Sequence, residues 1–217
     1  MTWSWYRVEV PIASFVIPLS RELPESYPFP PPTTVYGMLL SYIGETNRTV
    51  YRGTRLVIGV VSVPEVSWVL RKTRRFKQAK IDSKENSKPD YVCLLTSLDF
   101  IVGVKDSIQP GVPSLNGQVQ SAYLEPGAIA RFGGLSCGES HNLVNRFGPL
   151  TQDISQMENV WWLTQAAEGE WTVPTWVDHV GSERSVWVGA QFQPESWELI
   201  AEQIDHLAFT IDNGGIG

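Results

Sequence analysis

The sequence of 217 residues contains few of the side chains that build covalent or metal cross-links. Cys93 and Cys137 are its only cysteines, and its three histidines, His141, His179 and His206, lie far apart. Two thiols cannot form a disulfide framework or a four-cysteine zinc site. We therefore expect no metal, no cofactor and a reducing, cytoplasmic location.

Long hydrophobic runs and a high charge content are also missing. No apolar segment approaches the roughly 18 residues of a membrane-spanning helix, and residues 1–15 lack the basic start and apolar region of a signal peptide. These patterns predict neither membrane association nor secretion. Charged residues make up 18% and hydrophobic residues 42% of the chain, which argues against an intrinsically disordered chain. The length suits one large or two small domains.

Basic residues are scarce overall but concentrated in one stretch. The chain has 17 lysines and arginines against 23 acidic residues, a net charge of -6, which argues against a general nucleic-acid binder. Residues 71–80 nevertheless hold six basic side chains around Phe76. Such a stretch can follow a phosphate backbone and offer a stacking face. The alternative is a solvated charged run.

Hydrophobic patterning in the first half predicts an α+β fold. The segment 35–43 has one apolar helical face formed by Val35, Met38, Leu39, Tyr42 and Ile43. Thr33 or Thr34 is the expected N-cap, and Gly44 stands where a C-terminal glycine belongs. Strands are expected over 3–17, 56–63, 66–70, 91–95 and 98–104. The β-α-β-β order indicates an RRM-like or ferredoxin-like core, with the polar residues 71–90 in a protruding β-hairpin.

The second half is expected to be looser. We predict loops over 105–126, a short helix or turn over 126–132, antiparallel strands over 159–193 and a final helix that opens at Pro194. The expected domains are an RRM-like domain over 1–150 and a small β-rich subdomain with a terminal helix over 151–217. Most of the nine tryptophans are expected to pack in the core or across strands.

The first candidate site is the glycine-rich segment 133–140, GGLSCGES. Clustered glycines let a backbone approach a ligand closely, and their N–H groups can surround an anion. Ser136 and Ser140 add hydroxyl donors, and Arg131 and His141 flank the segment. The alternative is a tight surface loop without a ligand.

Catalytic signatures are weak. No hydrolase, metalloprotease or kinase motif occurs, and Cys137 and His141, four residues apart, do not establish a nucleophile and its base. A metal-free ribonuclease could use His141 with Tyr27 or Lys77, and this alternative stays open.

Three motifs resemble a known family. The segments PIASF (11–15), YPFPPPTTVYGMLLSYIG (27–44) and ARFGGLSCGESHNLV (130–144) are similar, in order and spacing, to the opening and the glycine-rich loop of the CRISPR-associated Cas five proteins. The similarity is greatest to the type I-B-like and myxobacterial-type branch, and it spans most of the chain. The hairpin around 66–104 lies where that family has its protruding thumb.

The resemblance implies a non-catalytic subunit of a type I Cascade complex. Such a subunit binds the 5′ handle of the CRISPR RNA and caps the filament of Cas seven backbone subunits. It also contacts the large Cas eight subunit that reads the PAM, near the PAM-proximal end of the target DNA. Related complexes act in antiviral defence, and others guide transposition together with transposition proteins. The sequence does not decide between these two roles.

The resemblance also assigns the expected RNA contacts. Handle contacts are expected from Arg131, Gly133, Gly134, Ser136, Gly138, Ser140 and His141. Thumb contacts are expected from Arg74, Arg75, Phe76, Lys77 and Lys80, and Tyr27 is expected to stack or hydrogen-bond beside the loop. Ser140 precedes His141, so the adjacent Lys–His pair of the RNA-cleaving type I-C branch is missing. Two alternatives remain: an endoribonuclease that processes precursor CRISPR RNA, and a protein-interaction subunit that touches no RNA.

Overall fold

A computed structural model describes residues 2–18, 24–74, 80, 83–178 and 183–212. Its elements are β1 (Ser4–Ala13), α1 (Pro32–Ile43), β2 (Arg55–Ser62), β3 (Glu65–Arg74), β4 (Ser87–Lys105), α2 (Leu115–Leu124), β5 (Arg146–Pro149), β6 (Trp161–Gln165), β7 (Trp171–Trp176), β8 (Val186–Pro194), α3 (Trp197–Leu207) and β9 (Phe209–Thr210). Short 3-10 turns span Lys84–Asn86, Pro126–Ala128 and Ile154–Gln156. The predicted α+β class is confirmed.

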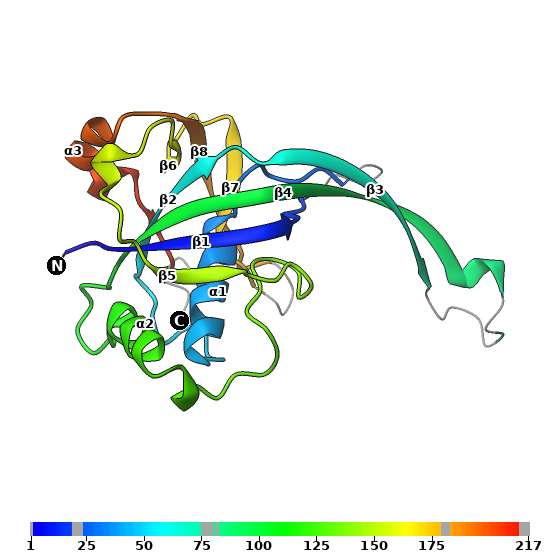
Figure 1. The fold of residues 1–217 in the computed structure, drawn as a ribbon, viewed down its shortest axis with the longest axis horizontal. Helices are drawn as coiled ribbons and strands as arrows, with labels where there is room; N and C mark the ends of the chain where they lie inside the picture. Colours follow the sequence, from blue (N-terminus) through cyan, green and yellow to red (C-terminus); the bar gives the residue numbers. More distant parts are fainter. Residues whose placement is uncertain (1, 19–23, 75–79, 81–82, 179–182, 213–217) are drawn as a thin grey trace.

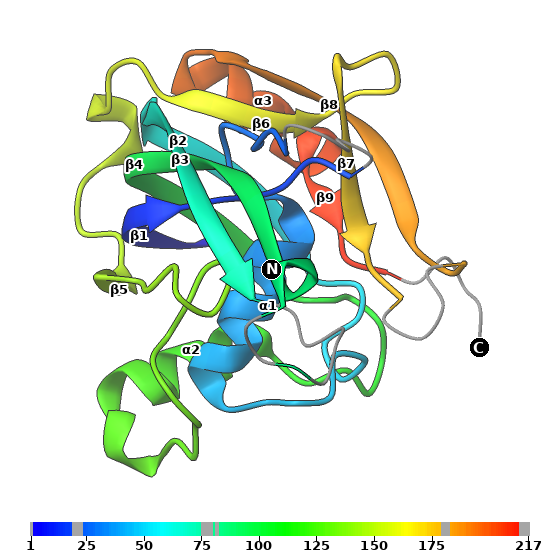
Figure 2. The same ribbon diagram turned by 90° about the vertical axis from the view of Figure 1, so that its right-hand side faces the viewer.

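The strands form one sheet in the order β5-β1-β4-β2-β6-β8-β7, with β3 paired to β4 and β9 to β2. All the pairings are antiparallel. Without the β3 hairpin, the first half reads β1-α1-β2-β4-α2-β5, the element order of a ferredoxin-like unit. Helices α1 and α2 lie on one face of the sheet and α3 on the other (Figures 1 and 2).

Helix α1 carries its apolar stripe into the larger of two cores. Val35, Met38 and Leu39 are buried there, as the spacing predicts. Gly44 ends the helix in the left-handed region, with φ 74°, and its N–H reaches the carbonyls of the last turn. The expected threonine cap is wrong: the N-cap is Pro31, without a side-chain hydrogen bond. Pro32, which has no N–H to satisfy, suits the first helical position.

Side chains along the strands of the sheet point alternately into two hydrophobic cores, one on each face. In β2, Leu56, Ile58 and Val60 face the core with α1, whereas Val57 faces the second core beneath α3. Tryptophans fill this second core above glycines. A Cβ on Gly103 would stand 2.7 Å from the Trp5 ring, and one on Gly59 would stand 2.9 Å from the Trp162 ring. The expectation that most tryptophans pack in the interior or across strands is therefore met in this core.

Two expectations about helices are wrong. Residues 115–124 form α2, where a loop was expected. The Ser114 side chain caps this helix by accepting from Gly117 N at 2.8 Å, and buried Asn116 donates to the Val104 carbonyl at 3.0 Å. The last helix begins at Trp197, because Pro194 still belongs to β8, where it pairs with Trp161.

The C-terminal strands continue the same sheet. Strand β6 pairs with β2 through Ile58–Leu163, and β8 and β7 follow outward. The sheet therefore has no break at the boundary expected near residue 150, and the division into two domains stays a prediction.

The predicted hairpin is present and leaves the body of the protein. Strand β4 is long: residues 99–104 lie between β1 and β2, residues 95 and 96 pair with both β1 and β3, and residues 87–94 pair with β3 alone. Figure 1 shows this two-stranded ribbon extending far beyond the sheet.

Candidate functional site

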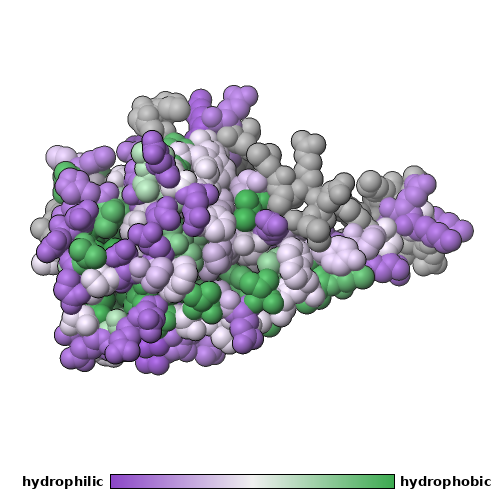
Figure 3. Space-filling view, turned by 90° about the horizontal axis from the view of Figure 1, so that it is seen from above, coloured by the Kyte–Doolittle hydropathy of each residue, from purple (hydrophilic) through white to green (hydrophobic). Residues whose placement is uncertain are grey.

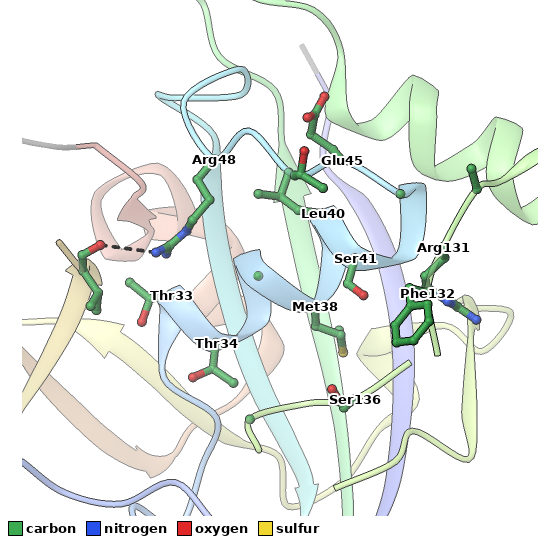
Figure 4. Close-up of a pocket in the computed structure, with 16 residues that line it drawn as sticks. Thr33, Thr34, Met38, Leu40, Ser41, Glu45, Arg48, Arg131, Phe132 and Ser136 are labelled. Carbon is green, nitrogen blue, oxygen red and sulfur yellow. Dashed lines mark hydrogen bonds between the residues drawn. The ribbon is translucent and has the colours of Figure 1, made fainter. Parts of the chain in front are cut away.

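A groove of about 590 Å³ separates α1 from the segment that leads into the glycine-rich loop. Thr33, Thr34, Gly37 and Ser41 of α1 line one side of it. The other side comes from residues 130–138, including Ser136 and Gly138 (Figure 4). Met38 and Leu40 of the same helix also line the groove, so the helix gives it both polar and apolar side chains.

Arg48 holds one end of the groove. The hydroxyl of buried Tyr36 donates to the Arg48 carbonyl at 2.7 Å. The Arg48 guanidinium donates to the Val177 carbonyl at 3.2 Å and lies 5.3 Å from the centre of the Trp176 ring. Partial burial lowers the pKa of Arg48 from its ordinary value, but an arginine keeps its charge at neutral pH. A fixed cation therefore closes this end.

Arg131 and Phe132 stand on the opposite side (Figure 4). The Arg131 Nε donates to the Gly133 carbonyl at 3.3 Å, and Gly133 has φ 78°, a conformation that a glycine adopts without strain. The Phe132 side chain is fully exposed. An uncovered aromatic ring beside a cation is a suitable platform for a base.

The glycine-rich loop is fixed by its own backbone and by one buried amide. Cys137 N donates to the Asn142 carbonyl at 3.0 Å, and Val144 N donates to the Leu135 carbonyl at 2.9 Å. Asn142 is fully buried, and its amide reaches the Ser14 carbonyl at the end of β1, 3.4 Å away. Burial raises the pKa of the Cys137 thiol to about 12. This thiol is therefore neutral at physiological pH and unsuited to act as a nucleophile.

Glu139 joins the loop to the hairpin. Its carboxylate lies 3.3 Å from the Nε2 of His141 and 3.8 Å from the Arg71 guanidinium of β3. Arg71 also pairs with Asp90 on the neighbouring strand at 3.2 Å. The two regions that the sequence indicated separately therefore meet at this carboxylate.

A second cavity, of about 560 Å³, lies toward the end of the hairpin. Lys72, Arg74, Lys84 and Ser87 are among its lining residues. Lys80 is exposed close by in the chain. Arg75, Phe76 and Lys77, which we expected to contact RNA, lie outside the described residues.

The predicted site residues thus fall into three groups. Arg131, Ser136 and Gly138 line the groove, and the glycines 133 and 134 follow Arg131 at its edge. Ser140 and His141 lie past Glu139, toward the hairpin. Arg74 and Lys80 belong to the hairpin end.

Tyr27 does not belong with the exposed residues. Its ring is buried, packs 5.4 Å from Phe29, and its hydroxyl donates to the Thr172 carbonyl at 2.5 Å. Tyr27 therefore ties the proline-rich loop to β7, and the expectation that it contacts RNA beside the loop finds no exposed surface. Its burial also raises its pKa.

The described residues were also considered for metal binding and for membrane-spanning helices. No group of three or more His, Cys, Asp or Glu side chains in this part of the chain could hold a metal ion. None of its helices is long and apolar enough to cross a membrane.

The fold and the groove define an α+β protein with a thumb-like hairpin and a glycine-lined cleft that carries Arg48, Arg131 and one acidic residue, Glu45. A protein of Myxococcus xanthus (strain DK1622), named CRISPR-associated protein Cas5, is 38% identical over 178 residues, covering 81% of this chain and 83% of its own length. At that identity and coverage the chain belongs to the CRISPR-associated Cas five family. No family model matches it.

Solved structures share the fold at low sequence identity. One chain, from a structure titled CRISPR RNA-guided surveillance complex, has a TM-score of 0.60 and 11% identity, with 90% of each chain covered. Another, titled crystal structure of Cas protein, has a TM-score of 0.53 and 14% identity, with 91% of this chain and 96% of that chain covered. These similarities show the fold.

Proposed function

We propose that this protein is a non-catalytic subunit of a type I Cascade complex and binds the 5′ handle of the CRISPR RNA in the groove between α1 and residues 130–138. The observation that supports this most directly is the pair of arginines, Arg48 and Arg131, on opposite sides of a groove that hydroxyls and glycines line in part and that holds one acidic residue, Glu45. Phosphates can approach such a backbone closely, and bent single-stranded RNA needs that closeness.

The chemistry of the groove agrees with positioning of the RNA. Arg131 and Arg48 neutralise phosphates, the α1 hydroxyls donate or accept hydrogen bonds, and Phe132 offers a face to an unstacked base. The whole chain has a net charge of -6, so RNA binding needs a local site of this kind rather than the general charge of the protein. In the complex, the bound handle end would cap the Cas seven filament and adjoin the Cas eight subunit, in defence or in guided transposition.

The endoribonuclease alternative requires a proton donor and acceptor around His141. Tyr27, one of its two proposed partners, is buried with its hydroxyl donated to a carbonyl. The other, Lys77, lies outside the described residues. Incubation of the purified chain with its own repeat RNA in EDTA, read on a denaturing gel, separates the two functions. Intact RNA is expected, and cleavage that disappears in His141→Ala would establish the enzyme instead.

Arg131→Ala tests the groove. Because a charged hydrogen bond contributes about 1.5–3 kcal/mol, handle RNA binding is expected to weaken by roughly 10- to 100-fold, with the thermal unfolding midpoint unchanged. Fluorescence anisotropy with labelled repeat RNA measures the affinity. Arg146→Ala, on the exposed strand β5, removes the same charge outside the groove and should leave the affinity near that of the unaltered protein. Equal affinities in the two variants would contradict the proposed site.

Glu139→Gln should strengthen RNA binding. In the free protein the Glu139 carboxylate contacts both His141 and Arg71. Its negative charge also repels an approaching phosphate. Partly exposed ion pairs are worth about 0.2–1 kcal/mol, so the expected gain is roughly 1.4- to fivefold. Glu202→Gln, on the opposite face in α3, makes the same change of net charge. A gain of the same size in both variants would show a general charge effect and would remove any special role for Glu139.

A further inference from the structure

The sheet is interrupted along one line, where the hairpin leaves it. Strand β4 pairs with β1 through Leu98 and through Thr96, but the described pairings include none for Ser97 between them. Pro11 of β1 lies opposite Ser97, and Pro64 lies in the short connection where β4 exchanges β2 for β3 as its partner. Neither proline has an N–H to donate to the ladder. We call the line of Pro11, Ser97 and Pro64 the crease.

Ser97 has an unusual backbone conformation at the crease. Its φ is 58°, in the left-handed region that a residue with a Cβ adopts only at a cost. The Ser97 side chain is exposed, so substitutions there disturb no core. Leu95, two residues further along the hairpin, is buried in the larger core and anchors the root of the hairpin. A strained residue beside an interrupted ladder is therefore the point that sets the direction of the hairpin.

Beyond its root the hairpin is a long lever. Figure 3 shows it as a slender projection from the body, with hydrophilic side chains toward its end. Residues 87–94 of β4 pair with β3 alone, and a two-stranded ribbon twists more freely than a wider sheet. A contact with the body part-way along the ribbon would therefore do much to hold its direction.

Glu139 of the glycine-rich loop makes such a contact. Its carboxylate lies 3.8 Å from the guanidinium of Arg71, which belongs to the protruding part of β3. Arg71 is itself fixed on the hairpin by Asp90 of the neighbouring strand, 3.2 Å away. The same carboxylate lies 3.3 Å from the Nε2 of His141 on the loop. The hairpin is thus tied to the loop through one carboxylate that the loop also binds.

We propose that the hairpin swings about its root at the crease, and that Glu139 tethers it in the orientation seen here. An anion bound at the glycine-rich loop competes with Glu139 for His141 and repels its carboxylate, which breaks the contact with Arg71 and frees the hairpin. By linkage, a change that frees the hairpin strengthens anion binding by the same factor. Identifying the anion as a phosphate of the handle RNA rests on the proposed function above, but the crease and the tether do not.

The test measures the distance between the end of the hairpin and the body in the full chain. Nitroxide labels are placed at Lys84→Cys in the turn that precedes β4 and at Gln120→Cys on α2, both of which are exposed. Cys93 and Cys137 are buried, so they should stay unlabelled. Double electron–electron resonance should give one dominant distance in the protein that carries only the labels.

Two substitutions should populate a second distance. Glu139→Gln removes the tether, and a partly exposed ion pair corresponds to a rise of about 1.4- to fivefold in the ratio of the second distance to the first. Ser97→Val places a β-branched residue in the left-handed region, which such residues avoid, and should raise this ratio by about five- to tenfold. Ser97→Gly should keep the single distance, because glycine adopts a positive φ without strain.

Matched controls separate the tether from charge and from folding. Asp90→Asn makes the same change of charge and breaks the other ion pair of Arg71, but this pair lies within the hairpin, so the distance should stay unchanged. Ser97→Asn should also keep the single distance, because asparagine tolerates the left-handed region. Thermal unfolding midpoints close to that of the unaltered protein show that each variant is folded.

The outcomes are distinct. Unchanged distances in both Glu139→Gln and Ser97→Val would overturn the proposal, and equal changes in Glu139→Gln and Asp90→Asn would remove the tether. Repeat RNA added to the labelled protein should itself populate the second distance. If bound repeat RNA leaves the distance unchanged, the release of the hairpin by the handle is wrong. If repeat RNA does not bind at all, the proposed function fails, whereas a second distance in Glu139→Gln and Ser97→Val still supports the crease and the tether.

Discussion

Trp162→Ala is expected to lower the free energy of unfolding by about 3–5 kcal/mol, the usual cost of removing a large buried aromatic side chain. Trp162 is 1% exposed. Its ring lies 6.1 Å from that of Trp5 and 5.8 Å from that of Trp197, and its indole N–H donates to the Glu195 carbonyl at 3.2 Å. The substitution leaves a cavity between the sheet and α3. Chemical denaturation monitored by circular dichroism measures the effect.

Trp187→Ala is the matched control for that experiment. Trp187 is 41% exposed, so its removal should cost less than about 1 kcal/mol. A small loss of stability in both variants would mean that the second core contributes little and that α3 is held mainly by the ion pairs of Asp205 with Arg55 and Lys105.

Elements with a clear hydrophobic periodicity could be predicted from the sequence. The apolar stripe of α1 predicts the helix, and Gly44 predicts where the helix ends. The polar, basic stretch between two apolar strands could not fill a core, so it had to protrude. Helix α2 was not predictable in this way. It contains Gly117 and Asn116, which are weak helix formers, and it is stabilised by contacts distant in sequence: Asn116 with the Val104 carbonyl and with the Tyr6 hydroxyl.

The glycine-rich loop and Arg131 could be proposed as a site from composition, because glycines and flanking cations are themselves the signal, and the site stays a prediction. Arg48 and Phe132, which also line the groove, could not be proposed in this way. Arg48 belongs to the groove only because the Tyr36 hydroxyl and the Val177 carbonyl hold it there, and no local spacing records such contacts. Tyr27 shows the opposite error: an aromatic residue in a proline-rich loop looked accessible, but the loop folds back and buries the ring against Phe29 and Trp171.

Gly37→Leu is expected to stabilise the protein and yet prevent handle binding. Gly37 lies on the α1 side of the groove, and a Cβ there would meet no atom within 4 Å. Leucine is a much better helix former than glycine, so the free energy of unfolding should rise by about 0.5–1 kcal/mol. The added side chain projects into the space that we assign to RNA. Repeat RNA that cannot reach both sides of the groove should bind about 100-fold more weakly. This loss corresponds to about 2.8 kcal/mol of binding free energy.

A rise in stability together with a loss of RNA affinity distinguishes a blocked groove from a damaged fold. An alanine variant of a partly buried arginine such as Arg48 could not make this distinction, because it would be expected to lower both. Gly127→Leu is a suitable control, because that glycine also has open space around a Cβ but does not line the groove; its RNA affinity should stay unchanged. Denaturant unfolding and anisotropy are measured on the same preparations. If Gly37→Leu binds repeat RNA as tightly as the unaltered protein, the RNA does not enter between α1 and residues 130–138, and handle binding must be sought on the hairpin instead.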